Sequence, residues 1–150
     1  MKEIERKFLV ESNEWRLLKC TGHSHIKQAY IQKSEAQSIR VRIIDSLAIL
    51  TIKIGKGLIR DEYEYEIPQL EALEIIEKAG LTVLQKTRYY VENGSDCWEI
   101  DVFEGKLAGL CIAEIELNDE NQKFELPSWL AKEVTSEAAY LNANLIDRLL

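Results

Sequence analysis

The sequence predicts a mainly β domain of the α+β class, built as a closed eight-stranded antiparallel β-barrel with flanking helices. Charged and apolar residues alternate with a period of two along segment after segment, as strands with one polar face require. Short turn signals separate these segments, and Asn93-Gly94 is the strongest of them. Closure into a barrel is favoured because it removes the unpaired edges of a sheet made of hairpins.

Length and composition limit the function classes. The 150 residues are expected to form a single domain, residues 1–150. Neither a membrane-spanning run nor the apolar core of a signal peptide is present, so a cytoplasmic location is expected. The net charge of −7 argues against a general nucleic-acid binder. Cys20, Cys97 and Cys111 lack metal-like spacing and are expected to be reduced thiols.

The first half of the chain is expected to contribute four strands. Residues 1–10 form the first, in which Glu3, Glu5 and Lys7 share one face. The next residues, 12–20, are predicted to form a short surface helix with Trp15, Leu17 and Leu18 as its apolar stripe, and His23 and His25 are expected in a polar loop. The remaining strands are predicted at 26–32, 38–44 and 47–54, with a tight turn at Asp45-Ser46.

The second half is expected to contribute four more strands and two helices. The strands are predicted at 58–67, 81–92, 95–103 and 109–117. A helix over 68–79 begins at Pro68 and stops before Gly80, and its apolar residues are Leu70, Leu73, Ile76 and Ala79. From residue 127 onward the pattern is helical, with a cap at Thr135 or Ser136 and a helix through Leu150.

The Asn93-Gly94 turn predicts a register for its hairpin. If these two residues occupy the centre of the turn, Arg88 lies opposite Glu99 and Lys86 lies opposite Asp101. Tyr89 would then meet Trp98 on the other face. Opposite charges would therefore pair directly across the ladder.

Charged residues on the alternating faces form one large set. It comprises eight acids and six bases: Glu3, Glu5, Lys7, Arg40, Arg42, Lys53, Glu62, Glu64, Lys86, Arg88, Glu99, Asp101, Glu114 and Glu116. Periodicity alone leaves two arrangements open, an apolar interior with these charges in water, or a charged lumen. The amphipathic helices need an apolar surface outside the sheet, which favours the charged lumen.

A lumen that contains both acids and bases points to two ligands, an anion and a cation. Unpaired charges in a low-dielectric space cost several kcal/mol each, so such a lumen must hold water, ion pairs, metal and ligand. Converging Lys and Arg side chains suit a polyanion, and Arg binds phosphate oxygens in bidentate fashion. Paired carboxylates suit hard divalent cations such as Mg²⁺ or Mn²⁺. The pattern therefore favours a polyphosphate together with a divalent metal.

Seven motifs in order resemble one known family. They are Glu3-x-Glu5-x-Lys7, Arg40-x-Arg42, Lys53 after Leu50-Thr51-Ile52, Glu62-x-Glu64, Lys86-x-Arg88, Asp101-x-Phe103 and Glu114-x-Glu116. Together they resemble the CYTH superfamily, the triphosphate tunnel metalloenzymes, over nearly the whole chain. The C-terminal Glu133-Val134-Thr135, with Tyr140 and Asn142, is similar to the single-domain bacterial inorganic triphosphatases. Ala131 and Ala139 depart from the residues usual there, Gly and Arg, and concern the C-terminal helix only.

The resemblance implies a role for each charged residue. Metal binding falls to Glu3, Glu5 and Glu116, with Glu114 beside them. Substrate binding falls to Lys7, Arg40, Arg42, Lys53, Lys86 and Arg88, with Lys7 near the metal. Glu62 and Glu64 are expected to orient the attacking water or a second metal. The implied catalytic residues are these two carboxylates together with Lys7 and Lys86. Glu99 and Asp101 are expected to orient Lys86 and Arg88.

The resemblance implies hydrolysis of the terminal phosphoanhydride of a triphosphate, foremost inorganic tripolyphosphate, with Mg²⁺ or Mn²⁺ as cofactor. Thiamine triphosphate and nucleoside triphosphates stay open as substrates, and a class IV adenylyl cyclase shares the tunnel. A binding module that holds polyphosphate or a nucleotide without turnover is the alternative outside the enzymes. The expected partner is a small-molecule triphosphate, without nucleic acid or membrane, and a homodimer is left open.

Overall fold

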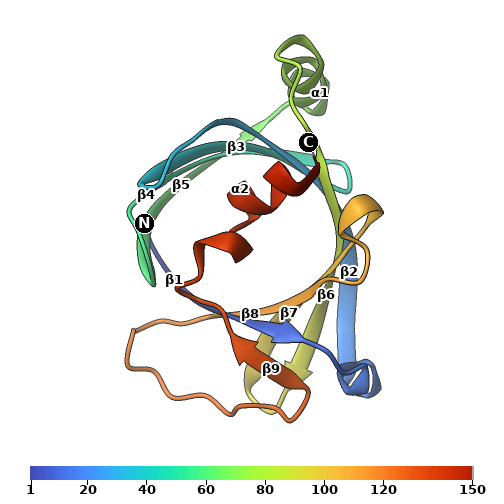
Figure 1. The fold of residues 1–150 in the computed structure, drawn as a ribbon, viewed down its shortest axis with the longest axis vertical. Helices are drawn as coiled ribbons and strands as arrows, with labels where there is room; N and C mark the ends of the chain where they lie inside the picture. Colours follow the sequence, from blue (N-terminus) through green and yellow to red (C-terminus); the bar gives the residue numbers. More distant parts are fainter. Residues whose placement is uncertain (150) are drawn as a thin grey trace.

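Eight strands close into an antiparallel barrel, as predicted, in the computed structural model, which describes residues 1–149 (Figure 1). Around the barrel the order is β1-β5-β4-β3-β2-β6-β7-β8, and β8 returns to β1. The strands are β1 (Lys2–Val10), β2 (Lys19–Lys33), β3 (Gln37–Ile44), β4 (Leu47–Ile54), β5 (Ile59–Ile67), β6 (Leu84–Asn93), β7 (Asp96–Phe103) and β8 (Cys111–Glu116). A further strand, β9 (Leu130–Glu133), pairs with β1.

Strand β1 joins three neighbours. One edge pairs with β8, whereas the other edge pairs with β5 over residues 2–4 and with β9 at Phe8 and Val10. Because β5 leaves the second half of this edge free, β9 satisfies its backbone groups. The prediction of helix from residue 127 onward is therefore wrong for β9.

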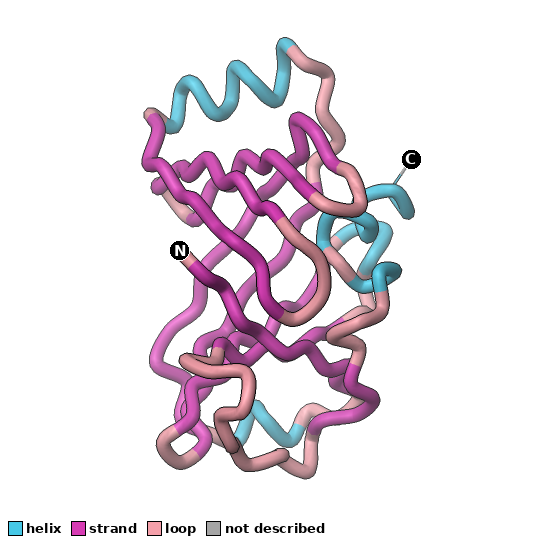
Figure 2. The backbone as a smooth tube through the Cα atoms, turned by 90° about the vertical axis from the view of Figure 1, so that its left-hand side faces the viewer, coloured by secondary structure: helices cyan, strands magenta, loops and turns pink. Residues whose placement is uncertain are grey.

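The C-terminal segment is also less helical than predicted. It contains the 3₁₀ helix η3 (Ala138–Tyr140), the one-turn helix α2 (Asn142–Leu145) and the 3₁₀ helix η4 (Ile146–Leu149). Leu150, the predicted end of the helix, lies outside the described residues. Leu145 and Ile146 pack with Leu84, Phe103 and Ile112, which take the inward-facing positions of their strands. The C-terminal helices therefore cover one end of the barrel with an apolar contact, as the two views show (Figures 1 and 2).

Strand β2 is longer than predicted. It begins at Lys19 and pairs with β6 from there on, with a bulge between Cys20 and Gly22. His23 and His25 thus lie in a strand and not in a loop, because the long β6 needs a partner along its whole length. Only the 3₁₀ helix η1 (Glu14–Leu17) forms in place of the predicted surface helix, and it buries Trp15.

The β6–β7 hairpin is shifted by two residues from the predicted register. Its loop is Gly94-Ser95, with Gly94 at φ +64°, and Asn93 pairs with Asp96. Arg88 consequently lies opposite Asp101 and Lys86 opposite Phe103. A shift of two residues leaves every side chain on its predicted face, so the inward charges are unaffected.

The apolar cores lie largely outside the barrel, as the charged-lumen interpretation requires. Helix α1 (Gln69–Lys78) buries Ala72 against Val41, Ile43 and Ala48 on the outer faces of β3 and β4. The predicted stripe of this helix is wrong in part, since Leu70 and Leu73 are exposed. A second core joins Phe8, Val10, Trp15, Val91, Trp98, Ile100, Ala113, Ile115, Leu117 and Trp129. Within residues 1–149, no helix combines the length and apolar character needed to cross a membrane.

Candidate active site

The lumen gathers all fourteen of the charged residues singled out in the sequence. Most of them line one chamber of about 590 Å³, open to solvent: Glu3, Glu5, Arg40, Arg42, Lys53, Glu62, Glu64, Arg88, Glu99, Glu114 and Glu116, with Asn142. Lys7 lines an adjoining chamber. Lys86 and Asp101 are completely buried and bond to each other beneath Arg88. The predicted alternation therefore delivers one continuous charged site.

Alternating charges form a chain of ion pairs across the lumen. Arg88 contacts Glu114 at 3.5 Å, and Lys7 lies 3.6 Å from both Glu114 and Glu5. The chain continues from Glu5 to Arg60 at 3.4 Å and from Arg60 to Glu3 at 3.5 Å. Lys53 continues the chain from Glu3, at 2.9 Å, to Glu62, at 3.4 Å, where the chain ends. Each side chain is thereby oriented into the lumen by neighbours of opposite sign.

Asp101 holds the deepest part of this chain. It accepts two hydrogen bonds from Arg88, at 2.7 and 2.9 Å, and one from Lys86 at 2.6 Å. Although burial favours its neutral form, these two cations hold the pKa of Asp101 below its ordinary value of 3.8. Burial lowers the pKa of Lys86 to about 7, since Asp101 offsets the loss of hydration only in part. Glu99 accepts a third bond from Arg88, at 2.8 Å, so both predicted orienting carboxylates contact Arg88.

Arg40 and Arg42 are buried cations that have no carboxylate partner among the described residues. Their residues are only 5% and 8% exposed, and within residues 1–149 neither makes an ion pair. Arg42 donates to Gln28 at 2.9 Å and Arg40 donates to Thr51 at 3.2 Å. Burial, followed by repulsion from Arg40 and Arg88, lowers the pKa of Arg42 to about 10. In the described part of the chain, Nε of Arg40 finds no hydrogen-bond acceptor. Because a buried charge without a counter-charge is costly, these two guanidinium groups favour the binding of an anion.

Carboxylates face one another on the opposite part of the lumen wall. Glu5 is the register partner of Glu116, and Glu99 is the partner of Glu114. Like charges directly opposite destabilise a sheet unless a cation lies between them. Burial, and then repulsion from Glu114, raises the pKa of Glu5, and burial also raises the pKa of Glu3. For Glu116 the pKa is raised by burial and by Glu3 and Glu5.

This donor set fits a hard divalent cation. Its groups are all carboxylate oxygens, which Mg²⁺ and Mn²⁺ prefer. The raised pKa values of Glu3, Glu5 and Glu116 reflect negative charge that burial leaves poorly solvated, whereas at Glu114 the cations Lys7 and Arg88 outweigh burial and hold the pKa well below 4.5. The carboxylates are spread around the chamber: within residues 1–149 no three of them are gathered as a ready-made metal site. Cation binding at this wall therefore requires the present ion pairs to rearrange.

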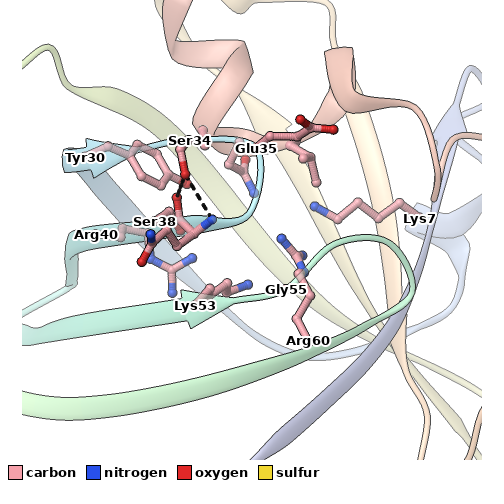
Figure 3. Close-up of a pocket in the computed structure, with 13 residues that line it drawn as sticks. Lys7, Tyr30, Ser34, Glu35, Ser38, Arg40, Lys53, Gly55 and Arg60 are labelled. Carbon is pink, nitrogen blue, oxygen red and sulfur yellow. Dashed lines mark hydrogen bonds between the residues drawn. The ribbon is translucent and has the colours of Figure 1, made fainter.

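A second, cation-lined chamber adjoins the first. It has a volume of about 520 Å³, and Lys7, Arg40, Lys53 and Arg60 point into it (Figure 3). Tyr30 and Asn142 also line it. Arg60 and Tyr30 were missed in the sequence, although the period of two places Arg60 on the face of Glu62 and Glu64. Asn142 could not be found in this way because it comes from α2, whose placement depends on the tertiary fold.

The Glu133-Val134-Thr135 segment fixes the backbone of Lys7. The Lys7 N–H donates to the Thr135 hydroxyl at 3.0 Å, and the N–H of Val134 donates to the Lys7 carbonyl at 2.8 Å. Thr135 in turn donates to Glu133 at 2.6 Å, and Glu133 accepts a 2.7 Å bond from Arg6. This C-terminal motif therefore positions a lumen lysine, without lining the lumen itself.

Comparison with known proteins shows to which family the chain belongs. The CYTH domain matches residues 1–150, so the chain belongs to the CYTH family. It is 44% identical over 147 residues to an inorganic triphosphatase of Acetivibrio thermocellus, covering 97% of this chain and 93% of the relative. It is 32% identical over 152 residues to an inorganic triphosphatase of Nitrosomonas europaea, covering 97% of each. These relatives are hydrolytic enzymes.

Solved structures share the architecture. The crystal structure of an inorganic triphosphatase that is 30% identical superposes with a TM-score of 0.65, covering 96% of this chain and 93% of that one. A Pyrococcus horikoshii protein, 20% identical, matches 79% of this chain and 80% of its own with a TM-score of 0.59. At this low identity, the similarity to the second structure concerns the fold alone.

Proposed function

We propose that the chain hydrolyses the terminal phosphoanhydride of a small linear triphosphate, foremost inorganic tripolyphosphate, with the help of a divalent cation. The observation that carries the proposal is that the guanidinium groups of Arg40 and Arg42 are buried and form no ion pair with any residue that the structure describes. This pair faces the same chamber as the carboxylate wall. A polyanion bound at the two arginines and a divalent cation bound at the carboxylates would neutralise the charge of each group. The two bacterial relatives are inorganic triphosphatases, which supports the same reaction.

Phosphate binding would fall to the cations that converge on the two chambers. Arg40 and Arg42 offer planar forks for two phosphate oxygens each, and Arg88 is held by Asp101 in a fixed orientation. Lys7 and Lys53 can exchange their present carboxylates for phosphate oxygens. Lys86 lies deeper, so its charge acts on the substrate through the chamber wall. Neutralising and positioning the phosphates would supply most of the rate.

The carboxylate wall would hold the cation and position the water. Glu3, Glu5, Glu114 and Glu116 are the proposed ligands. A divalent cation bound there would neutralise charge that develops on the phosphate oxygens. Glu62 and Glu64 lie on β5, the strand that pairs with β1, and are proposed to accept hydrogen bonds from the attacking water. The water's oxygen forms the new bond to the terminal phosphorus, and the bond from that phosphorus to the bridging oxygen breaks.

Phosphate release with Mg²⁺ or Mn²⁺ tests the proposal, with tripolyphosphate, thiamine triphosphate and ATP compared in parallel. We expect metal-dependent release, fastest from tripolyphosphate, because the described residues that line the chamber with the carboxylates are all charged apart from Asn142 and offer no apolar surface to a base or a thiazole ring. Tight binding of tripolyphosphate without release would indicate a binding module instead. Pyrophosphate and cyclic AMP formed from ATP would indicate a cyclase.

Metal should stabilise the fold more as the pH rises. Glu3, Glu5 and Glu116 have pKa values above the ordinary 4.5 in the folded protein, so protonation of these groups stabilises the fold. This stabilisation is complete below about pH 4.5 and is lost as the pH rises through the folded-state pKa values. A divalent cation must displace these protons. We expect the Mn²⁺-induced rise in Tm to be larger near about pH 8 than near about pH 5. Thermal melts with and without metal measure it, and equal shifts at both pH values would contradict it.

A further inference from the structure

Arg60 lies between two of the carboxylates on β1. It is the register partner of Glu3, and its Nη2 atom is 3.5 Å from Oε1 of Glu3 and 3.4 Å from Oε1 of Glu5. All three side chains are at least 86% shielded, with 14%, 11% and 13% exposed. The guanidinium thus acts as a cationic bridge between Glu3 and Glu5.

The same guanidinium also borders the cation-lined chamber. There it shares the space with Lys7, Arg40 and Lys53, whose charged ends point toward it in Figure 3. Four cations and one carboxylate, that of Glu35, line this chamber, so its lining attracts an anion. Arg60 therefore lies at the boundary of an acidic wall and an anion-binding space, within reach of both.

We propose that Arg60 is exchanged between these two sides: it neutralises Glu3 and Glu5 before metal binds, releases them to the divalent cation, and then contacts the polyphosphate. The inference rests on the proposed function, since it takes Glu3 and Glu5 as metal ligands. A divalent cation next to both carboxylates would repel a guanidinium that stayed between them. The released fork matches two phosphate oxygens, and rotation about the flexible Arg side chain suffices for the exchange.

Metal and anion affinities, measured separately and without turnover, test this role. In Arg60→Gln we expect roughly tenfold tighter Mn²⁺ binding, because the competing cation is gone, and roughly tenfold weaker binding of tripolyphosphate in the absence of metal. Mn²⁺ binding is followed by electron paramagnetic resonance, and tripolyphosphate binding by calorimetry. A purely structural role would weaken both. Arg60→Lys keeps the charge, so its Mn²⁺ affinity should stay near wild type while the bidentate phosphate contact is lost.

Lys2→Gln is the matched control. Lys2 lies on the outer face of the same strand pair, 2.8 Å from Asp61, and its removal changes the net charge equally. Both affinities should match wild type in this variant. Unchanged or weaker Mn²⁺ binding in Arg60→Gln, with Mn²⁺ binding lost in Glu5→Gln, would overturn the exchange and leave the proposed function standing. Equal Mn²⁺ binding in wild type and Glu5→Gln would overturn the metal assignment and the exchange with it.

Discussion

Replacing Glu5 with Gln is expected to reduce metal-dependent tripolyphosphate hydrolysis by roughly a thousandfold. Glu5 lies opposite Glu116 and 3.6 Å from Lys7, at the centre of the carboxylate wall. The amide keeps the shape of the side chain but removes one of the negative charges that the proposed cation needs. Initial rates of phosphate release at saturating metal and substrate measure the loss.

The same substitution should not destabilise the metal-free protein. Burial raises the pKa of Glu5, so folding disfavours its charged form, and a neutral amide avoids this cost. We expect a Tm equal to or above that of wild type and no further rise on addition of Mn²⁺. Glu11→Gln, on an exposed residue just beyond β1, is the control and should behave as wild type in both assays. Near wild-type turnover in Glu5→Gln would refute the assignment of Glu5 to the metal.

The barrel and its charged lumen could be predicted because both depend on a period of two, which survives errors in strand length and register. The hairpin after Arg88 illustrates this: its loop begins one residue later than predicted, yet Arg88 still contacts Glu99 and Asp101. The shift itself depends on which residue takes the positive φ, and Gly94 in the first loop position satisfies that with Asn93 still paired in the ladder.

Elements whose form depends on tertiary contacts could not be predicted in this way. The segment Leu130–Glu133 reads as helix, but the free edge of β1 makes it a strand. Residues 19 and 20 were predicted as the end of a helix and His23 and His25 as part of a loop, but the length of β6 extends β2 through all of them. Helix α1 presents Ala72 to the sheet because the smallest side chain allows the closest approach, and its larger leucines remain outside. Local pattern was overridden by backbone pairing in two cases and by packing in the third.

The candidate site was predicted nearly completely for charged residues and poorly for the contacts among them. Arg60 follows the same period of two as Glu62 and Glu64, so the sequence does contain the signal that places it on the lumen face. That it bridges Glu3 and Glu5 depends on the pairing of β1 with β5, which closes the barrel between strands far apart in sequence. Asn142 reaches Lys86, at 3.3 Å, only because α2 covers the end of the barrel.

The largest stability effect is expected at Asp101, where substitution by Asn should lower the free energy of unfolding by about 3 kcal/mol and the Tm by roughly 10 °C. Asp101 is fully buried and pairs with Lys86 and Arg88. Its neutral replacement leaves two buried cations with less compensation, and Glu99 and Glu114 can satisfy only Arg88. Urea and thermal unfolding of the metal-free protein measure the change.

Asp61→Asn provides the comparison, since Asp61 pairs with Lys2 at the surface and its loss should cost at most about 1 kcal/mol. Lys86 supplies an internal check on the cause. Without Asp101 its pKa should fall further below about 7, so it would lose its proton and relieve part of the strain as the pH rises. The destabilisation by Asp101→Asn should therefore be greater in mildly acidic solution than in alkaline solution. A loss that is small and independent of pH would show that Asp101 is not needed to hold the two cations in the lumen.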